Sequence, residues 1–224
     1  MSFLLVPGAG GSAWYWHLVL PFLDDAVAVT LPTADDSAGL AEYAEAIVAA
    51  GRQLTDITLV AQSMGGFSAP LAVERLDVRR IVLVNAMVPR PGETAGDWWA
   101  NTGQGEANRA QAEADGRTIS AEFDLEETFF HDVPEHVTRE ALGRTDHAQS
   151  DRPFADPWPL AAWPDLPTHV VAGRDDRFFP PDFQRHIAKE RLGLDVEEIP
   201  GGHLVALSKP EVLAQTLRES LDRS

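Results

Sequence analysis

The sequence contains no cysteine among its 224 residues. This absence excludes disulfide bonds, thiolate nucleophiles and cysteine-ligated metal sites. Basic residues are also scarce, because 18 Lys and Arg stand against 35 Asp and Glu, for a formal net charge of −17. Nucleic-acid grooves and anionic membrane surfaces attract cationic proteins. The composition therefore argues against both kinds of partner.

Long apolar runs and a basic N-terminal segment are missing as well. The first basic residue is Arg52, and Pro7 and Gly8 end the apolar run that begins at residue 3. A secretory signal needs a positive segment before roughly 7–15 apolar residues, and a membrane-spanning helix needs about 20. We therefore expect a cytoplasmic protein, either a monomer or a homodimer, with no membrane partner.

The chain does contain short apolar runs that alternate with helical patterns. Hydrophobic residues make up 44% of it, which is enough for one compact core. Predicted helices cover residues 14–23, 40–51, 65–76, 182–192 and 210–221. Predicted strands cover residues 3–6, 26–31, 57–61, 80–84, 168–172 and 195–199. This alternation is typical of a parallel sheet flanked by helices.

The alternation breaks between residues 88 and 163. This stretch contains several prolines and no strand-like apolar run. Because a structureless loop of that length is uncommon inside a compact domain, we predict an inserted helical lid with helices near 104–115 and 134–146. Residues 1–87 and 164–224 then form the core.

A serine lies where a predicted strand meets a predicted helix. Residues 60–66 read V-A-Q-S-M-G-G, which places Ser63 at a sharp strand-to-helix turn. Such a turn exposes the hydroxyl beside a helix N-terminus that stabilises developing negative charge. Gly65 and Gly66 allow the close backbone approach that the turn needs. Ser63 could instead simply cap the helix, so its role as a nucleophile depends on partners elsewhere.

An acid and a base follow in the order that a serine triad has on a parallel sheet. Asp175 and Asp176 come directly after the strand at 168–172, and a carboxylate there can orient an imidazole. Asp176 is the preferred acid, whereas Asp175 is better suited to bracing the turn. His203 lies on a glycine-rich loop before the last helix, and its ordinary pKa suits proton transfer near neutrality.

The tetrahedral intermediate of acyl transfer needs two backbone N–H donors. Met64, next to Ser63, supplies one, and the glycine-rich run at 8–11 after the first strand supplies the other. The same run could hold a phosphate, but it lacks the spacing of the dinucleotide and P-loop motifs. We therefore expect no nucleotide, no metal and no other cofactor.

These motifs resemble the α/β-hydrolase superfamily over nearly the whole chain, and within it the compact branch of plant methylesterases and hydroxynitrile lyases. Residues 6–16 are similar to that branch's H-G-A-x-x-x-A-W-x-W run, with Pro7 in place of histidine. Residues 60–66 are similar to V-G-H-S-x-G-G, with Ala61 and Gln62 as departures. The resemblance implies an α/β-hydrolase fold with a mostly parallel six-stranded sheet and a helical lid after the fourth strand.

The resemblance also assigns roles to individual residues. Residues 173–180 match G-x-x-D-x-x-x-P, which selects Asp176 over Asp175 as the acid. Gly202 and His203 match the histidine loop of the family, and the run at 8–11 makes Ala9 the second oxyanion donor beside Met64.

The same comparison separates hydrolysis from lyase chemistry. The lyases of this branch carry threonine where Gly8 stands and lysine just after the catalytic histidine, where this chain has Leu204. We therefore expect a serine hydrolase that cleaves a small, largely apolar carboxylic ester, thioester or lactone through an acyl-enzyme on Ser63. A small-molecule-binding protein of the same fold, with little or no turnover, is the alternative.

Aromatic residues gather in the predicted lid and are expected to line an apolar substrate pocket. Packing of the lid on the sheet is the other role open to each of them, and His131 and Asp132 could add polarity at the pocket mouth. The candidates for substrate binding are Trp98, Trp99, Phe129, Phe130 and Trp158.

Overall fold

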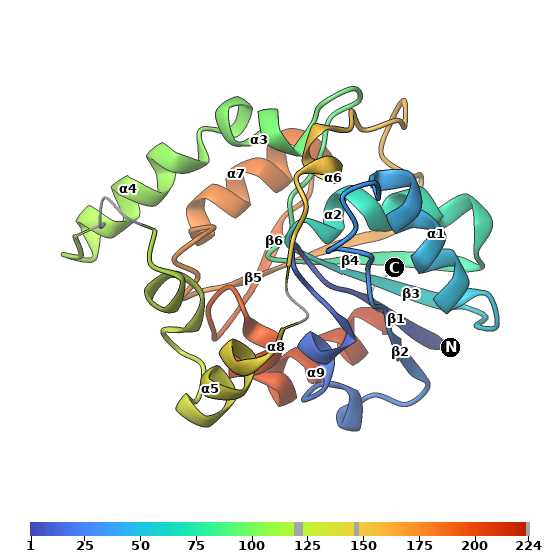
Figure 1. Cartoon of the computed structure of the whole chain (residues 1–224), viewed down its shortest axis with the longest axis horizontal. Helices are drawn as coiled ribbons and strands as arrows, with labels where there is room; N and C mark the ends of the chain where they lie inside the picture. Colours follow the sequence, from blue (N-terminus) through green and yellow to red (C-terminus); the bar gives the residue numbers. More distant parts are fainter. Residues whose placement is uncertain (119–122, 146–147, 223–224) are drawn as a thin grey trace.

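Six parallel strands form one sheet in the order β2-β1-β3-β4-β5-β6 in the computed structural model, which describes residues 1–118, 123–145 and 148–222. The carboxyl ends of all strands therefore lie at one edge of the sheet (Figure 1). The predicted number and direction of the strands are confirmed. The strands are β1 (Ser2–Val6), β2 (Ala26–Ala28), β3 (Ile57–Gln62), β4 (Val78–Val84), β5 (Thr168–Gly173) and β6 (Val196–Ile199).

Helices cover both faces of the sheet (Figure 1). One face carries α1 (Leu40–Gly51), α2 (Gly65–Ser68) and α7 (Pro181–Leu192). The other carries the 3-10 turn η1 (Ala13–Trp16), α8 (Val205–Ser208) and α9 (Pro210–Glu219). None of the helices within the three described ranges combines the length and the hydropathy that crossing a bilayer requires.

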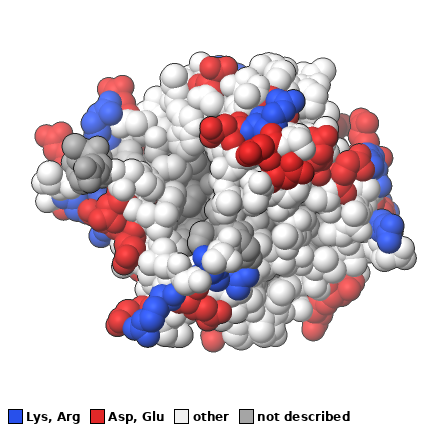
Figure 2. Space-filling view, in the orientation of Figure 1, with Lys and Arg blue, Asp and Glu red and all other residues white. Residues whose placement is uncertain are grey.

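Charged side chains occupy the outer parts of the face shown in Figure 2, and acidic ones are the more numerous. A hollow near the middle of this face is bordered mainly by uncharged residues. On this face the acidic side chains therefore lie mainly away from the hollow.

The core forms two layers, one on each face of the sheet. Alternate residues of β1 point to opposite layers, so that Leu4 and Val6 join the first layer while Phe3 and Leu5 join the second. Because both faces are buried, the strands read as continuous apolar runs rather than as alternating patterns.

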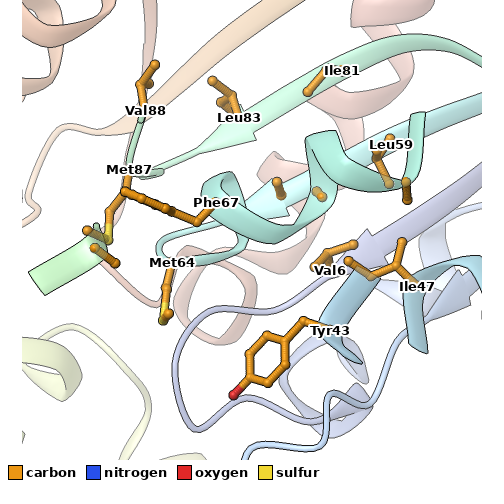
Figure 3. Packing of buried hydrophobic residues seen from close by; sticks show 14 of the residues in the cluster. Val6, Tyr43, Ile47, Leu59, Met64, Phe67, Ile81, Leu83, Met87 and Val88 are labelled. Atoms are coloured by element: carbon orange, nitrogen blue, oxygen red, sulfur yellow. The ribbon is translucent and has the colours of Figure 1, made fainter. Parts of the chain in front are cut away.

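The first layer holds α1 and α2 against the sheet. Figure 3 shows Tyr43 and Ile47 of α1 near Val6, and Phe67 of α2 near Met87. All five side chains are at most 1% exposed. This packing fixes the N-terminal end of α2, and with it the turn that precedes this helix.

Two predicted α-helices contain proline, and the structure forms them partly or wholly as 3-10 helices. The helix predicted at 14–23 consists of η1 and a second 3-10 turn, η2 (Leu20–Phe22), and Pro21 lies in the latter. The helix predicted at 65–76 is α-helical only in α2 and continues as η3 (Ala69–Arg75), a 3-10 helix with Pro70 near its start. Proline lacks the N–H group that an α-helical hydrogen bond requires and clashes with the preceding turn.

The described residues of the stretch 88–163, called the inserted segment below, are mainly helical. The predicted helices at 104–115 and 134–146 correspond to α4 and α5, although residue 146 lies outside the described residues. Helix α3 was not predicted, although Thr94 Oγ1 accepts a hydrogen bond from Asp97 N at 2.9 Å, a capping signal that the sequence carries. The elements are α3 (Ala95–Thr102), α4 (Gln104–Ala114), the π-helical turn η4 (Glu126–Phe130), α5 (Glu135–Gly143) and α6 (Arg152–Ala155).

Candidate active site

Ser63 lies in a strained turn between β3 and α2. Its φ of 51° falls in the left-handed region, which residues other than glycine rarely adopt. The N–H groups of Met87 and Gly66 donate to the Ser63 carbonyl at 2.9 and 3.1 Å and hold the turn. The hydroxyl-bearing residue thereby lines the cavity at the carboxyl edge of the sheet.

Glycine is required at two positions beside this turn. A Cβ on Gly66 would lie 1.9 Å from the Met87 carbonyl oxygen, and one on Gly65 would lie 2.9 Å from that of Pro7. Ala61, which departs from the family pattern, is fully buried in the first core layer. The sequence therefore has glycine at the two positions of this turn where a side chain would clash with a backbone carbonyl.

Three side chains distant in sequence meet at the Ser63 turn. His203 Nε2 lies 3.0 Å from Ser63 Oγ, and His203 Nδ1 lies 2.8 Å from Asp176 Oδ2. The relative exposures of Ser63, Asp176 and His203 are 9%, 2% and 2%. Because Nδ1–H can donate a hydrogen bond to the carboxylate, Nε2 is the ring nitrogen that can accept from the hydroxyl. The structure thus brings together the three residues selected from the sequence.

The Asp176 carboxylate is buried but well supplied with donors. Its Oδ1 accepts hydrogen bonds from the backbone N–H groups of Phe178 and Phe179 at 2.8 and 2.9 Å. Two such bonds offset the cost of removing the carboxylate from water. They also leave Oδ2 directed at the imidazole of His203.

The carboxylate of the neighbouring Asp175 binds the histidine loop rather than the imidazole. Asp175 Oδ2 accepts from Gly201 N at 3.0 Å, and Asp175 N donates to the Gly201 carbonyl at the same distance. Its side chain is half exposed. Asp175 therefore braces the acid loop against the histidine loop, and Asp176 alone of the two reaches the imidazole.

Aromatic rings surround the imidazole of His203. The ring centroids of Phe129, Phe178 and Phe179 lie 5.2, 5.1 and 5.0 Å from that of the imidazole. These apolar neighbours limit water around the ring, and electrostatic interactions are stronger where water is excluded.

Two backbone amides are available beside Ser63. Ala9 and Met64 both line the same cavity as Ser63, and neither N–H group donates to a protein acceptor within the described residues. Their neighbours are engaged, because Gly8 N donates to Gln62 Oε1 at 3.0 Å and Gly10 N donates to Gln149 Oε1 at 2.8 Å. The arrangement leaves the two predicted oxyanion donors free to bind a ligand oxygen.

A cavity of about 410 Å³ opens at Ser63 and corresponds to the hollow in Figure 2. Its walls are mostly apolar. The inserted segment contributes the expected Trp99, Phe129 and Phe130. Further wall residues are Leu125, Ala141, Leu142, Phe154, Phe178, Leu204 and Leu207.

Two of the predicted pocket residues lie elsewhere. Trp98 is fully buried, and its indole N–H donates to the Val88 carbonyl at 3.1 Å. Trp158 is 1% exposed and donates to the Phe67 carbonyl at 3.1 Å. The expectation that they line the pocket is wrong, because each indole packs into the core where a backbone carbonyl satisfies its N–H group.

His131 and Asp132 do not line the cavity either. Asp132 Oδ2 accepts from Gly202 N at 2.7 Å, so the inserted segment contacts the loop that carries His203. Burial, together with the positive charge of Arg177, lowers the pKa of His131 below its ordinary value. The two residues belong to the support of the histidine loop rather than to the pocket mouth.

Some residues of the site were not selected from the sequence. Tyr15 lines the cavity, and burial raises the pKa of its hydroxyl, which stays protonated. Arg144 also lines it, with its guanidinium 5.1 Å from the Trp14 ring. Gln62 ends an apolar strand and Asn85 directly follows one, a position that could have marked them as site residues.

Within the described ranges, no three His, Asp or Glu side chains converge as a metal site would require.

Nearly the whole chain is similar to known hydrolases. The model of the alpha/beta hydrolase family matches residues 3–216. A protein of Phoma sp. described as probable hydrolase R7 is 24% identical over an alignment that covers 96% of each chain.

Solved structures of similar fold cover the whole chain. A pyrethroid hydrolase from Sphingobium faniae aligns with 100% of this chain and 98% of its own, with a TM-score of 0.76 and 20% identity. An extracellular α/β-hydrolase from a Paenibacillus species aligns over 100% of both chains, with a TM-score of 0.75 and 18% identity. The methylesterase MES16 from Arabidopsis aligns over 99% of both, with a TM-score of 0.75 and 17% identity.

Proposed function

Because the chain belongs to the alpha/beta hydrolase family, we propose that it is a serine hydrolase that cleaves a small, largely apolar carboxylic ester, thioester or lactone. The observation that carries this proposal is the continuous hydrogen-bond chain from Asp176 through His203 to the Ser63 hydroxyl. That chain ends at an apolar cavity lined by Ala9 and Met64, whose N–H groups donate to no acceptor in the part of the chain that the structure describes.

Acylation of Ser63 uses each part of this arrangement. His203 Nε2 takes the hydroxyl proton as Ser63 Oγ attacks the substrate carbonyl carbon. The buried Asp176 carboxylate stabilises the imidazolium that forms, and the N–H groups of Ala9 and Met64 stabilise the oxyanion. The intermediate collapses when His203 donates its proton to the leaving alcohol or thiol, and an acyl-enzyme remains on Ser63.

Deacylation reverses the proton transfers with water as the nucleophile. His203 accepts a proton from water, which attacks the acyl carbonyl carbon, and then returns the proton to Ser63 Oγ. The carboxylic acid leaves and the starting state is restored. The chemistry in this scheme comes from the side chains and backbone of the chain itself.

The walls of the cavity support a mainly apolar substrate. Trp99, Phe129 and Phe130 come from the inserted segment, whereas Leu204 and Leu207 come from the core. In our proposal residues 88–163 act as a lid, and the substrate binds between this lid and the carboxyl edge of the sheet.

Lyase chemistry has less support at this site. A Cβ on Gly8 would lie 2.7 Å from the Ser63 Cβ and 2.6 Å from Gln62 Oε1, so the threonine of the lyases does not fit at this position. Leu204, which follows His203, is an apolar wall residue and provides no cation for a cyanide leaving group.

Labelling with a fluorophosphonate probe tests the proposal directly. We expect rapid labelling of the wild type and none of Ser63→Ala, because the probe reacts with an activated serine hydroxyl. With 4-nitrophenyl acetate, Ser63→Ala should reduce kcat/KM by at least about 10⁴-fold. Ser37→Ala, at an exposed position, is the control and should label and turn over as the wild type does.

Folded wild-type protein that neither reacts with the probe nor hydrolyses any ester would contradict the proposal. Measurable binding of small esters under those conditions would then favour a binding protein. Release of aldehyde and cyanide from cyanohydrins, without esterase activity, would favour a lyase.

A further inference from the structure

Two buried side-chain amides converge on the backbone of His203. Asn85 Nδ2 donates to the carbonyl oxygens of Gly202 and His203 at 3.0 and 3.1 Å. Gln62 Nε2 donates to the same His203 carbonyl at 3.4 Å. Asn85 is fully buried and Gln62 is 3% exposed. The carbonyl of the proposed base thus receives donors from the carboxyl ends of two adjacent strands, β3 and β4.

The acceptor atoms of the same two amides reach the other loops of the site. Asn85 Oδ1 accepts from Gly173 N at 2.6 Å, at the end of β5 and three residues before Asp176. Gln62 Oε1 accepts from Gly8 N at 3.0 Å, next to Ala9. Each amide therefore connects the histidine loop to one further part of the site.

The histidine loop has little rigidity of its own. It contains Gly201, with a φ of 123°, and Gly202, and glycine leaves the backbone the most conformational freedom. The imidazole of His203 must nevertheless keep hydrogen bonds at both ring nitrogens at once. Asp175 and Asp132 hold the N–H groups of Gly201 and Gly202, and the hydrogen bonds from Asn85 and Gln62 add a constraint at the His203 carbonyl itself.

A primary amide provides both the donor and the acceptor that positions 62 and 85 use. Aspartate and glutamate have the same shapes but accept only when ionised. The backbone also restricts which residue can stand at position 85. Its φ of 46° is left-handed, and asparagine and aspartate tolerate that region best among non-glycine residues.

We propose that Asn85 and Gln62 are positioning residues that hold the His203 backbone so that its imidazole stays between Asp176 and Ser63. This inference rests on the proposed function, since it describes how the base of that reaction is kept in place. Asn85 additionally fixes the spacing between the acid loop and the histidine loop through Gly173.

Two shape-conserving substitutions test this role. Asn85→Asp and Gln62→Glu keep the oxygens that accept from Gly173 N and Gly8 N, but replace the donor to the His203 carbonyl with a second oxygen. We expect each to reduce kcat for 4-nitrophenyl acetate by about 10- to 100-fold, because small misplacements of a catalytic group have costs of this order. For Asn85→Asp, KM should change by less than about threefold, since Asn85 is not one of the residues that line the cavity. Gln62 is a wall residue, so Gln62→Glu is judged by kcat and not by KM.

The control for stability is Ile57→Val, at the opposite end of β3 from Ser63. It should lower Tm slightly and leave kcat unchanged. The Asn85→Asp, Gln62→Glu double variant should lose less activity than the product of the single losses, because both act on one carbonyl group. Losses that multiply fully would show that the two amides do not act through one shared carbonyl group, which would contradict the proposal. A kcat loss that follows Tm in all variants would indicate that the two amides only stabilise the fold.

A second measurement does not depend on turnover. The proton shared by His203 Nδ1 and Asp176 should give a downfield proton NMR signal in the wild type that is weakened or shifted in both variants. An unchanged signal together with unchanged kcat overturns the positioning role. If the wild type shows the signal but neither labels nor hydrolyses esters, the proposed function fails while the NMR comparison still decides the role of the two amides.

Discussion

Two residues of the proposed site have strained backbone conformations. Ser63 and Asn85 have left-handed φ angles of 51° and 46°, and they directly follow the neighbouring strands β3 and β4. Such conformations cost roughly 1–3 kcal/mol each and persist only where their surroundings fix them. At Asn85 the backbone N–H donates to the Val171 carbonyl at 2.9 Å, and at Ser63 two N–H groups hold the carbonyl. The sheet thus stabilises two strained turns side by side.

Adjacent aspartates allow a matched test of the acid at the residue scale. Asp176→Asn should reduce kcat by about 10³- to 10⁴-fold, because the amide no longer holds His203 in the tautomer that accepts from Ser63. Asp175→Asn should keep nearly full activity, since its remaining side-chain oxygen can still accept from Gly201 N. Steady-state kinetics on one 4-nitrophenyl ester measure both variants. Equal losses in the two would contradict the assignment of Asp176.

At the scale of elements, a buried ion pair joins the inserted segment to α7. Arg191 Nη1 and Nη2 lie 2.5 and 3.1 Å from the Glu93 carboxylate oxygens, and Nη1 also donates to the Val88 carbonyl. The two side chains are 1% and 4% exposed. Burial raises the pKa of Glu93, but hydrogen bonds from Arg191 and Asn101 outweigh it and hold this pKa below its ordinary value.

Removing the negative charge of this pair should destabilise the protein. We expect Glu93→Gln to lower the free energy of unfolding by about 3–5 kcal/mol at pH 7, because Arg191 is left buried without a counterion. Urea denaturation measures this change. Glu45→Gln is the matched control, because its partner Arg75 is exposed, and its denaturation midpoint should stay close to that of the wild type.

The lowered pKa of Glu93 also gives the sign of a pH dependence. A carboxyl group with a lower pKa in the folded state stabilises the protein above its unfolded pKa of about 4.3, and this contribution is lost as pH falls through the folded value. The difference in unfolding free energy between wild type and Glu93→Gln should therefore be full at pH 7 and shrink below about pH 4. A difference that grows on acidification would be inconsistent with an ionised Glu93.

Two neighbouring phenylalanines of η4 should differ in their effect on substrate selection. Phe129 packs against the His203 ring and Phe130 belongs to the cavity wall beside the second core layer. Phe130→Ala should shift the preferred 4-nitrophenyl ester to a longer acyl chain, since it enlarges a cavity of about 410 Å³. Phe129→Ala should lower kcat for every chain length, because His203 loses an apolar neighbour. A chain-length series with both variants checks this, and identical profiles would rule out separate roles.

At the scale of the whole molecule, acidic residues are in excess, and on the face shown in Figure 2 they lie outside the hollow. A net charge of −17 produces self-repulsion in the folded state, and salt screens interactions beyond about 10 Å at 0.1 M. Raising NaCl from about 10 to 200 mM should therefore increase Tm by a few degrees. Sucrose at the same osmolarity controls for non-ionic effects. A Tm that falls with salt would show that attractive ion pairs outweigh the repulsion.

Much of the architecture followed from local patterns. The strands at 3–6, 57–61, 80–84 and 168–172 are continuous apolar runs because helices cover both sides of them, and the parallel sheet and the family resemblance are confirmed. Helix α3 was missed, and the strand predicted at 26–31 is shorter, ending at Ala28 in the edge strand β2. Local propensity identifies an element more easily than its ends, which neighbouring elements decide.

The amino-acid sequence by itself determined the sheet, the strand-to-helix turn at Ser63 and the chain order in which Ser63, Asp176 and His203 occur. These depend on steric and periodic properties that neighbouring residues carry. Only the tertiary structure decided which aromatic side chains face the cavity, so that Trp99 lines it while Trp98 is fully buried. Only it revealed that Asn85 and Gln62 meet at the His203 carbonyl. Contacts of this kind join residues more than a hundred positions apart, and no local pattern specifies which buried groups will satisfy one another's hydrogen bonds.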